Sequence, residues 1–553
     1  MSKSPTSEYF VSQSQKKAPF HLFRRDLYFV TQSQVRDQEE HALGETLSEL
    51  GYRKRRGWRR IVPGSDIDPV LMNRPVQASL LLVFLCPSLA ISREAISYRL
   101  SYSMDGSGRV DITVELPKPA PGPRILVVPR AVPMGYGEQP YDRFVKQIQA
   151  YAADGRVLPV ARQRGPRWKV GEDGMSVGRI EYAVDVAGME RDILAAADTS
   201  KLRPGYLSLL GYSVFAYVEG LEGWPAALEI RVPRDWPVLT TLAPQSPPPK
   251  GRTSGRATDF YALADSQVVA GPELSVSRLE CTVPLYLALY AEGEVTRELM
   301  GRLAEEAMKA VVDYFGGAPF EHYTVLQELL RPASKHHRYG FSMEHLDSGT
   351  FSLALGRGLT ESSKPEELAR TRYNFAHHFA HAWIPKRAYG KGYFPFRWEL
   401  APLLDSIWFS EGFAQFAAIE AIADGLPEPV GRRYRETMLA ERFRRTLDRA
   451  PLFIQQMSLV ELSRVASTRY SEDFRTGRNV FSRGGLMAAE MDALIREKSK
   501  GAKRLRDGLR HLVNWSKSHR RAFEIDEIPA IFLEATGVDT REVLERWLAP
   551  LSN

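Results

Sequence analysis

Two histidines four residues apart, His377 and His381, are the first candidates for chemistry in this sequence. On a helix, residues at this spacing project from the same face, one turn apart. Two imidazoles placed in this way can reach one tetrahedral zinc ion. Helical histidine pairs also occur by chance, so the pair alone is weak evidence for a metal site.

A third candidate ligand, Glu411, lies 30 residues after His381, inside the apolar stretch 406–413. A carboxylate in such a stretch is costly to bury unless it is paired or bound to a metal. A salt bridge in the helix interior is the alternative to a metal site. If the three side chains meet, two histidines, a glutamate and a water form the ligand set of a catalytic zinc site. We therefore expect one zinc ion per chain.

The segments that contain these residues carry a resemblance to a known family. Residues 377–387 read His-His-Phe-Ala-His-Ala-Trp-Ile-Pro-Lys-Arg, and residues 408–413 read Trp-Phe-Ser-Glu-Gly-Phe. They resemble the His-Glu-x-x-His and Trp-Phe-x-Glu-Gly-Phe motifs of the glycyl aminopeptidases, a family of gluzincin metallopeptidases. The resemblance implies that His377, His381 and Glu411 bind the zinc ion.

Two further segments extend the resemblance, which covers the chain from about Ile96 to its end. Residues 315–323 are similar to the family's Phe-Gly-x-Pro-Phe-x-x-Tyr. Residues 340–348 resemble its Gly-Leu-Glu-His segment, whose glutamate holds the free amino group of the substrate. The resemblance thus implies that Glu344, with Met343 beside it, binds the substrate. We expect this chain to lack the PDZ domain that many members carry.

Four positions depart from the family pattern. His378 stands where the family has the glutamate that takes a proton from the zinc-bound water. Val480 and Phe481 stand where the family has two tyrosines, so the phenol that would stabilise the oxyanion is missing at both positions, and either Phe481 or Val480 fills its place. Gln415 stands where an aspartate is common, and its amide can still accept a hydrogen bond from a ligand histidine. His378 is either a working base, because imidazole has a suitable pKa, or the mark of a site without fast hydrolysis.

The first half of the chain has the pattern of a β-rich domain. From residue 96 to about 284, apolar and polar residues mostly alternate, as in residues 110–116 and 228–232. This alternation predicts strands with one buried face. Residues 212–218 are a further β-rich run, and residues 243–258 read as a polar loop.

From residue 295 the apolar residues recur at the spacing of a helix, and helices are expected to dominate to the C-terminus. Five residues share one face of the first of these helices: Leu299, Leu303, Ala307, Ala310 and Val311. At 553 residues the chain is too long for a single core. We expect a multidomain α+β protein with a β-sandwich-like N-terminal domain (93–275), a thermolysin-like metallopeptidase domain (276–445) and a helical C-terminal domain (446–553).

An internal segment has the anatomy of a secretory signal peptide. In residues 72–92 a Met and an Arg precede an apolar run, which Ser88-Leu-Ala90 then follows with small residues at the cleavage spacing. A buried strand is the alternative for the apolar run, which is too short to span a bilayer. We expect translation to begin at Met72, residues 1–71 to be a disordered upstream extension, and the protein to be secreted or periplasmic.

Composition excludes several other classes of protein. Hydrophobic residues make up 44% of the chain and charged residues 25%, as in ordinary globular proteins. Two cysteines cannot form a disulfide framework or a thiolate metal site. The net charge of +7 comes without a basic stripe interleaved with aromatic residues, so no nucleic-acid partner is expected.

These observations predict a zinc metallopeptidase-like protein that acts on or binds peptides with a free N-terminus. The alternative is a catalytically inactive pseudopeptidase that keeps the cleft to capture peptides, and the changes at His378 and Phe481 favour it. Lys386 and Arg387 either pair with acids near the cleft or lie on a solvated turn. After signal cleavage no stable membrane insertion is expected. The sequence leaves the substrate side chain and the oligomeric state open.

Overall fold

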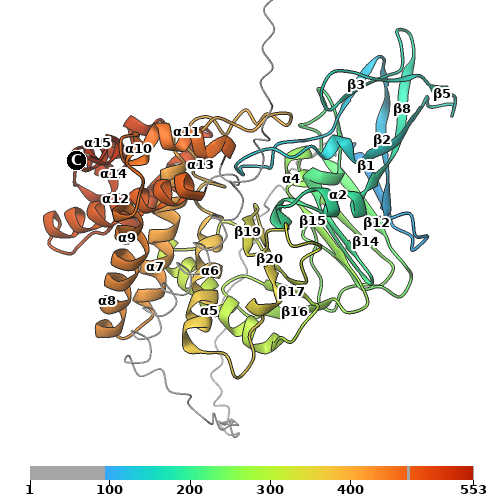
Figure 1. The fold of residues 1–553 in the computed structure, drawn as a ribbon. Coiled ribbons are helices and arrows are strands. Elements are labelled where there is room, and N and C mark those ends of the chain that lie inside the picture. The colour runs from blue at the N-terminus through green and yellow to red at the C-terminus, as the bar shows by residue number, and fades with distance from the viewer. Residues whose placement is uncertain (1–93, 470–473, 552–553) are drawn as a thin grey trace, which may run out of the picture.

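The computed structural model describes residues 94–469 and 474–551 of the chain. The predicted upstream extension (1–71) and the predicted signal peptide (72–92) lie outside these residues. Figure 1 shows a β-rich N-terminal domain, a central region of sheet and helices, and a helical C-terminal part. This arrangement confirms the predicted α+β fold class.

The N-terminal domain contains three sheets. In strand β1 (Ile96–Ser101) every second residue is buried, as expected for a strand with one face on a core. The largest sheet has the order β14 (Arg252–Ala257), β12 (Ala226–Arg231), β1, β2 (Arg109–Pro121), β8 (Ser176–Asp185), β4 (Val145–Tyr151) and β5 (Val157–Leu158). A second sheet has the order β13 (Val238–Thr240), β15 (Gln267–Ala270), β10 (Tyr206–Leu210) and β9 (Lys201–Arg203). The third has the order β11 (Tyr217–Val218), β3 (Arg124–Val127), β7 (Arg167–Val170) and β6 (Val160–Arg162).

Two segments of this domain differ from the sequence-based expectation. The predicted strand 212–218 begins instead with the short helix α3 (Gly211–Val214), and only its end is strand β11. All four residues of α3 are buried, so apolar composition could not distinguish helix from strand. The predicted loop 243–258 contains strand β14, whose place at the sheet edge allows its polar side chains to face solvent.

A five-stranded sheet forms the central region. Its order is β16 (Ser275–Leu279), β17 (Leu285–Ala291), β18 (Tyr323–Leu330), β20 (Ser348–Ala354) and β19 (Phe341–Glu344). Strands β17, β18 and β20 run parallel, and β19 pairs antiparallel with β20 at the edge. The expectation that helices dominate after residue 295 was wrong for β18 to β20. All residues of β18 are buried, so its sequence lacks the alternation that marks a strand.

The predicted helix after residue 295 is present as α5 (Arg297–Phe315), which connects β17 to β18. On its predicted face Leu299, Leu303, Ala307 and Val311 are buried, and Ala310 is partly buried. Helix α5 packs against α6 (Pro365–Ala380), which in turn packs against α7 (Ala414–Asp424). These three helices form the helical layer beside the five-stranded sheet (Figure 1).

The other helices of the C-terminal half lie on the far side of α7 and are orange to red in Figure 1. They are α8 (Glu428–Thr437), α9 (Arg445–Asp448), α10 (Leu452–Gln455), α11 (Leu459–Arg469), α12 (Phe474–Lys498), α13 (Leu505–His519), α14 (Ile528–Thr536) and α15 (Arg541–Leu548). One hydrophobic cluster extends from β17 to α15, across the boundary predicted at residue 445. The division of the chain into domains stays a prediction.

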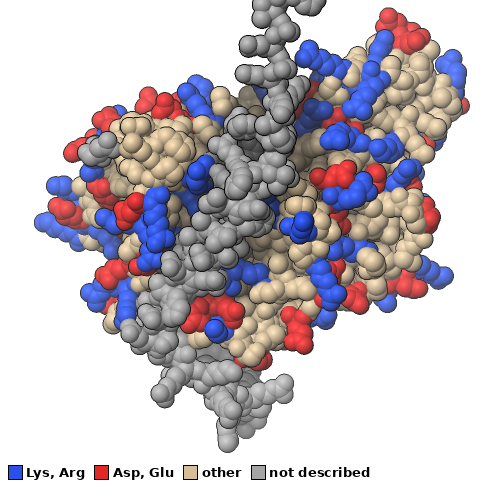
Figure 2. Space-filling view, viewed as in Figure 1, with Lys and Arg blue, Asp and Glu red and all other residues tan. Residues whose placement is uncertain are grey.

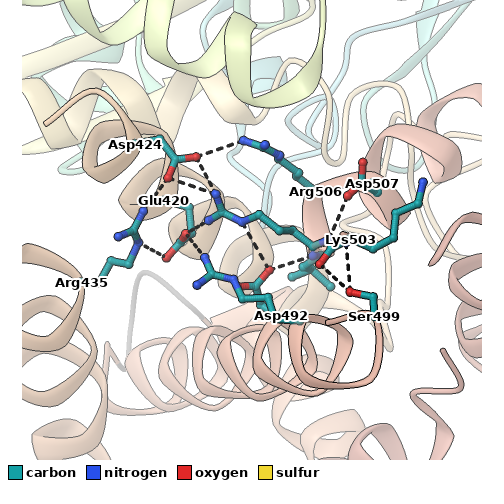
Figure 3. A network of polar contacts seen from close by, with 11 residues as sticks. Glu420, Asp424, Arg435, Asp492, Ser499, Lys503, Arg506 and Asp507 are labelled. Carbon is teal, nitrogen blue, oxygen red and sulfur yellow. Dashed lines mark hydrogen bonds and ion pairs between the residues drawn. The ribbon is translucent and has the colours of Figure 1, made fainter. Parts of the chain in front are cut away.

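A charge network around the buried Glu420 joins α7 to α8, α12 and the start of α13 (Figure 3). Glu420 on α7 accepts a hydrogen bond from Arg435 on α8 at 2.8 Å and lies 3.4 Å from Arg496 on α12. It also pairs with Arg504, which precedes α13, and Arg504 reaches Asp424 at the end of α7. Because Glu420 is buried, removing its carboxylate would leave these guanidinium groups without their common partner.

The surface carries charges of both signs. On the face shown in Figure 2, Lys and Arg are interspersed with Asp and Glu over the described residues. Within residues 94–469 and 474–551, no helix has the length and apolar character needed to cross a bilayer.

Candidate functional site

Helix α6 carries both predicted histidine ligands at its C-terminal end. The helix begins where Pro365 occupies its first position and the Lys364 N–H donates to the Glu367 carboxylate at 2.8 Å. His377 lies in the last turn, and His381 is the C-terminal cap. Both side chains are buried, and their Nε2 atoms are 3.3 Å apart. The spacing in the sequence therefore brings the two rings together as predicted.

Glu411 lies on the π-helical segment η4 (Trp408–Phe413), directly before α7. Such wide turns recur at functional sites. Two glycines allow η4 to lie against α12, because a β-carbon on Gly412 or on Gly484 would overlap the backbone of the other segment. This close packing fixes the position of Glu411 relative to α12.

The three predicted ligand atoms form a nearly equilateral triangle. Glu411 Oε2 is 3.5 Å from His377 Nε2 and 3.7 Å from His381 Nε2, and the third side is the 3.3 Å between the two histidines. A tetrahedral zinc ion with bonds of about 2.0–2.2 Å holds its ligand atoms roughly 3.3–3.6 Å apart. The residues present therefore fit one zinc ion and leave a fourth position for water or substrate.

Hydrogen bonds and burial prepare these side chains to bind a cation. His381 Nδ1 donates to the Ile384 carbonyl oxygen at 2.9 Å, so its Nε2 keeps the lone pair. Burial lowers the pKa of His377 well below its ordinary value, and the neighbouring histidines add to the effect, so this ring is neutral at pH 7. Burial raises the pKa of Glu411 to about 7 against the opposing effect of His381. A divalent cation between the three groups stabilises the carboxylate form.

Gln415 lies near the ligands, but its hydrogen bonds differ from the predicted one. Its amide oxygen lies 3.4 Å from the Tyr373 hydroxyl oxygen and 3.5 Å from Arg442 Nε. The buried Nδ1 of His377 has no hydrogen-bond partner among the described residues. The Tyr373 ring stacks on His377 with a centroid distance of 6.3 Å. In this structure Gln415 therefore supports Tyr373 and not a ligand histidine.

A cavity of about 410 Å³ opens beside the metal ligands. It lies between the N-terminal domain and the rest of the chain, because Tyr136 and Asp198 of that domain form part of its wall. His377 and Glu411 line the same cavity. A ligand in the cavity would therefore contact both the metal and the N-terminal domain.

Glu344, the predicted amine-binding residue, lies at the end of β19 and lines this cavity. It is buried, and one carboxylate oxygen lies within 4.8 Å of ligand atoms of both His381 and Glu411. Met343 also lines the cavity and packs against the core of the N-terminal domain. The structure thus places both predicted substrate residues beside the metal ligands.

The turn after β19 is held by charged side chains that were ambiguous in the sequence. Asp265 of the N-terminal domain accepts a hydrogen bond from the Leu346 N–H at 2.6 Å. Lys386 is buried with its Nζ 3.7 Å from Asp265, and Arg387 pairs with Asp347 at 2.7 Å. Lys386 and Arg387 therefore pair with acids near the cavity and fix the end of β19.

His378 lines the cavity on the side of Glu344. Its Nδ1 is 3.6 Å from a Glu344 carboxylate oxygen, and its ring meets Phe351 edge-to-face at 5.4 Å. With 11% of the side chain exposed, the ring faces the cavity and not the bulk solvent. Its position thus fits proton transfer, contact with the amine site, or both.

The structure separates Val480 and Phe481, the two residues that the resemblance places at tyrosine positions. Phe481 lines the cavity, whereas Val480 is completely buried in the core. Of the two, Phe481 therefore faces the site and brings no hydroxyl to it.

Sequence reasoning missed Tyr136, which lines the cavity from the N-terminal domain. It lies far from the histidine motif in the sequence, in the segment Met134-Gly-Tyr-Gly137. The glycines mark a turn, but no local pattern indicates that this turn reaches a metal site.

Comparisons with known proteins agree with this architecture. Residues 97–272 match the Peptidase M61 N-terminal domain family, whereas no curated protein sequence matches the chain. An aminopeptidase N family protein from Idiomarina loihiensis has a similar crystal structure, with a TM-score of 0.72 and 18% identity over 83% of this chain and 76% of that chain. An M1 zinc metallopeptidase from Deinococcus radiodurans is less similar, with a TM-score of 0.48 and 16% identity over 83% of this chain and 94% of that chain. The family match and the Idiomarina loihiensis structure therefore indicate a metallopeptidase-like aminopeptidase fold.

Proposed function

We propose that this protein binds the amino end of peptides at a zinc site in a metallopeptidase-type cleft. The observation that carries the proposal is the triangle formed by His377, His381 and Glu411, with the Glu344 carboxylate at its side. The aminopeptidase-like fold and the M61-type N-terminal domain support a place among the gluzincin metallopeptidases.

The separation of Glu344 from the metal ligands supports selection of an N-terminal residue. In a peptide the first amino group and the first carbonyl are joined through a single Cα atom, so both lie within a few ångströms. One carboxylate oxygen of Glu344 lies within 4.8 Å of ligand atoms of His381 and Glu411. A free amine held by Glu344 would therefore bring the first carbonyl oxygen to the fourth zinc position. When bound, zinc polarises such a carbonyl and lowers the pKa of a bound water.

A catalytically inactive pseudopeptidase is the second candidate, and the position of His378 favours it. The His378 ring lies against Glu344, where it can contact the bound amino group. Phe481 removes the family's phenol from the cavity wall, which lowers the expected turnover further. Both candidates share the zinc site and the binding of peptide N-termini, and they differ in turnover.

The test uses the full chain loaded with one equivalent of zinc. Isothermal titration compares Gly-Ala-Ala with its N-acetylated form, and turnover on Gly- and Ala-aminoacyl amides is measured on the same sample. We expect the free amine to bind at least ~10-fold more tightly, because a buried carboxylate recognises the charged ammonium group. The Glu344→Gln variant should lose this preference. Equal affinity for both peptides in the wild type would refute the proposal.

We also propose that the protein is exported to the periplasm or outside the cell. The support is the order of a Met, an Arg, an apolar run and small residues in segment 72–92. The intact mass of native protein decides the question. Cleavage after Ala90 is the expected result, and soluble cytoplasmic protein that retains residues before Met72 would refute it.

A further inference from the structure

We propose that Arg442 binds a carboxylate group of the peptide, one that lies beyond the peptide's first residue. This carboxylate is either the C-terminus of a short peptide or an acidic side chain. The inference rests on the proposed binding of peptide N-termini and assigns a substrate class to that site. It follows from the exposure of Arg442 in the cavity wall, from the lack of an acidic partner among the described residues, and from its contacts with Gln415 and Tyr373.

Arg442 lies on a second π-helical segment, η5 (Met438–Arg444), in the wall of the cavity beside the metal ligands. Such segments are frequent at functional sites. Met438, Glu441 and Phe443 of η5 line the same cavity. Met438 and Phe443 are buried, whereas Arg442 is exposed. Arg442 is therefore a wall residue of the cavity that a ligand can reach.

Among the described residues, no acid pairs with the Arg442 guanidinium. Its Nε lies 3.5 Å from the Gln415 amide oxygen, which is a long contact, and it forms no ion pair within residues 94–469 and 474–551. Glu441, the neighbouring acid of the cavity wall, pairs with Arg445 instead. An arginine has five N–H donors and stays charged in proteins. Arg442 therefore keeps donors for a carboxylate of the ligand.

The identity of residue 415 is one reason why Arg442 is unpaired in the described part of the chain. The Gln415 amide oxygen lies near both the Arg442 Nε and the Tyr373 hydroxyl, so one neutral group contacts the two side chains. A carboxylate on residue 415 would form an ion pair with Arg442 and compete with a carboxylate of the ligand. The glutamine, which stands where an aspartate is common, leaves the charge of Arg442 available.

Arg442 lies within reach of a peptide held at the metal ligands. Its guanidinium carbon is 4.6 Å from the centre of the Tyr373 ring, which stacks on His377 at a centroid distance of 6.3 Å. The guanidinium carbon is therefore at most about 11 Å from the centre of the His377 ring, a length that about three extended residues span. A peptide whose amino group is held by Glu344 can thus bring a carboxylate of its second or third residue to Arg442.

A second arginine supports carboxylate binding at this wall. Arg478 of α12 is exposed, lines the same cavity and forms no ion pair within the described residues. Helix α12 packs against η5, so the two arginines lie on adjacent elements. The acids Glu344 and Glu411 lie at the metal position. The cavity therefore carries acids that complement an ammonium group and arginines that complement a carboxylate, as a zwitterionic peptide requires.

The experiment measures binding to the full chain loaded with one equivalent of zinc, so it does not depend on turnover. Isothermal titration compares Gly-Ala-Ala with its C-terminal amide, and the amide of Gly-Glu-Glu with the amide of Gly-Gln-Gln. The first pair tests a C-terminal carboxylate, and the second pair tests an acidic side chain. In at least one pair, we expect the wild type to bind the carboxylate peptide about 10-fold more tightly, the effect of one hydrogen bond between charged groups. This preference should weaken as the salt concentration rises.

Three variants and a control test the role of Arg442. Arg442→Gln should abolish the preference, while its zinc content and its affinity for the uncharged amide stay those of the wild type. Arg442→Lys keeps the charge but not the planar fork, and should retain part of the preference. Gln415→Glu places a carboxylate beside Arg442 and should reduce the preference. The control Arg444→Gln removes an exposed arginine of η5 that does not line the cavity, and should bind all four peptides like the wild type.

Each outcome has a defined meaning. Equal affinity of the wild type for both members of both pairs would overturn the inference and leave the proposed function standing. An unchanged preference in Arg442→Gln would also overturn it. An equal loss of affinity for the acid and the amide in this variant would make Arg442 a positioning residue for Tyr373, which again contradicts the inference. If the wild type binds none of the four peptides, the proposed function fails first, and the inference fails with it.

Discussion

The substitution His378→Glu returns a carboxylate to the position directly after the first histidine ligand. Our reasoning predicts that zinc-loaded wild type hydrolyses aminoacyl substrates slowly or not at all. A positioned general base typically contributes a factor of about 10²–10⁴ to the rate. His378 lines the cavity, so a glutamate at this position can reach a zinc-bound water. Turnover of the variant should therefore rise by about that factor, with little change in peptide affinity.

The structure also predicts a cost for this substitution in the zinc-free protein. His378 Nδ1 is 3.6 Å from the Glu344 carboxylate, so the new carboxylate would lie about as close to a like charge. Two unit charges at 4 Å repel each other by about 4 kcal/mol at an effective dielectric constant of 20. Bound zinc offsets this repulsion. The variant should therefore show a lower melting temperature than the wild type without zinc and a larger rise when zinc is added.

The assay compares the wild type, His378→Glu and the neutral, nearly isosteric control His378→Gln. Turnover of Gly- and Ala-aminoacyl amides is measured at one zinc per chain, and thermal unfolding with and without zinc. The Gln variant should lack both the gain in rate and the repulsion. Equal turnover of the Glu and Gln variants would show that position 378 does not face the water. Wild-type turnover near one per second or above, with an inactive His378→Ala, would identify His378 as a working base and refute our reasoning.

Three further predictions follow from the same structure. His381→Ala should lower the zinc content, measured by mass spectrometry, well below one ion per chain, because it removes one of the three predicted zinc ligands. An unchanged zinc content would refute the predicted zinc site. Glu420→Ala should lower the free energy of unfolding, measured in urea, by about 2–3 kcal/mol. The variant removes the carboxylate shared by the arginines of the network, while Asp424 still holds Arg504. A loss too small to measure would refute this role of Glu420. Burial raises the pKa of Asp198 in the folded protein to about 6, above the ordinary value of about 4 in the unfolded chain. The free energy of unfolding therefore falls as pH rises from about 4 to about 6, and it stays lower at higher pH. Asp198→Asn should therefore raise the melting temperature at pH 7.5 and have no such effect near pH 4, and an equal gain at both values would contradict the argument.

The sequence by itself determined the features that depend on local spacing. His377 and His381 meet because four residues make about one helical turn, whatever surrounds the helix. The buried face of α5 and the alternation in β1 follow from periodicity in the same way. Periodicity failed for β18 and α3, because elements buried on every side carry no contrast between polar and apolar faces.

The resemblance supplied the pairing of Glu411 with the histidines and the role of Glu344, which spacing alone could not give. Even so, a motif does not fix which way each neighbour points. Only the fold shows that Gln415 turns to Tyr373 and that Phe481, not Val480, faces the cavity.

The place of Tyr136 in the cavity wall is the clearest feature that tertiary structure alone decided. Its distance from the histidines along the chain gives no local signal. Its position depends on non-local contacts: the packing of Met134 in a core built mainly from later residues and the hydrogen bond from Lys386 to Pro133. Spacing along a helix specifies which residues share a face, whereas contacts between distant segments exist only once the whole chain has packed.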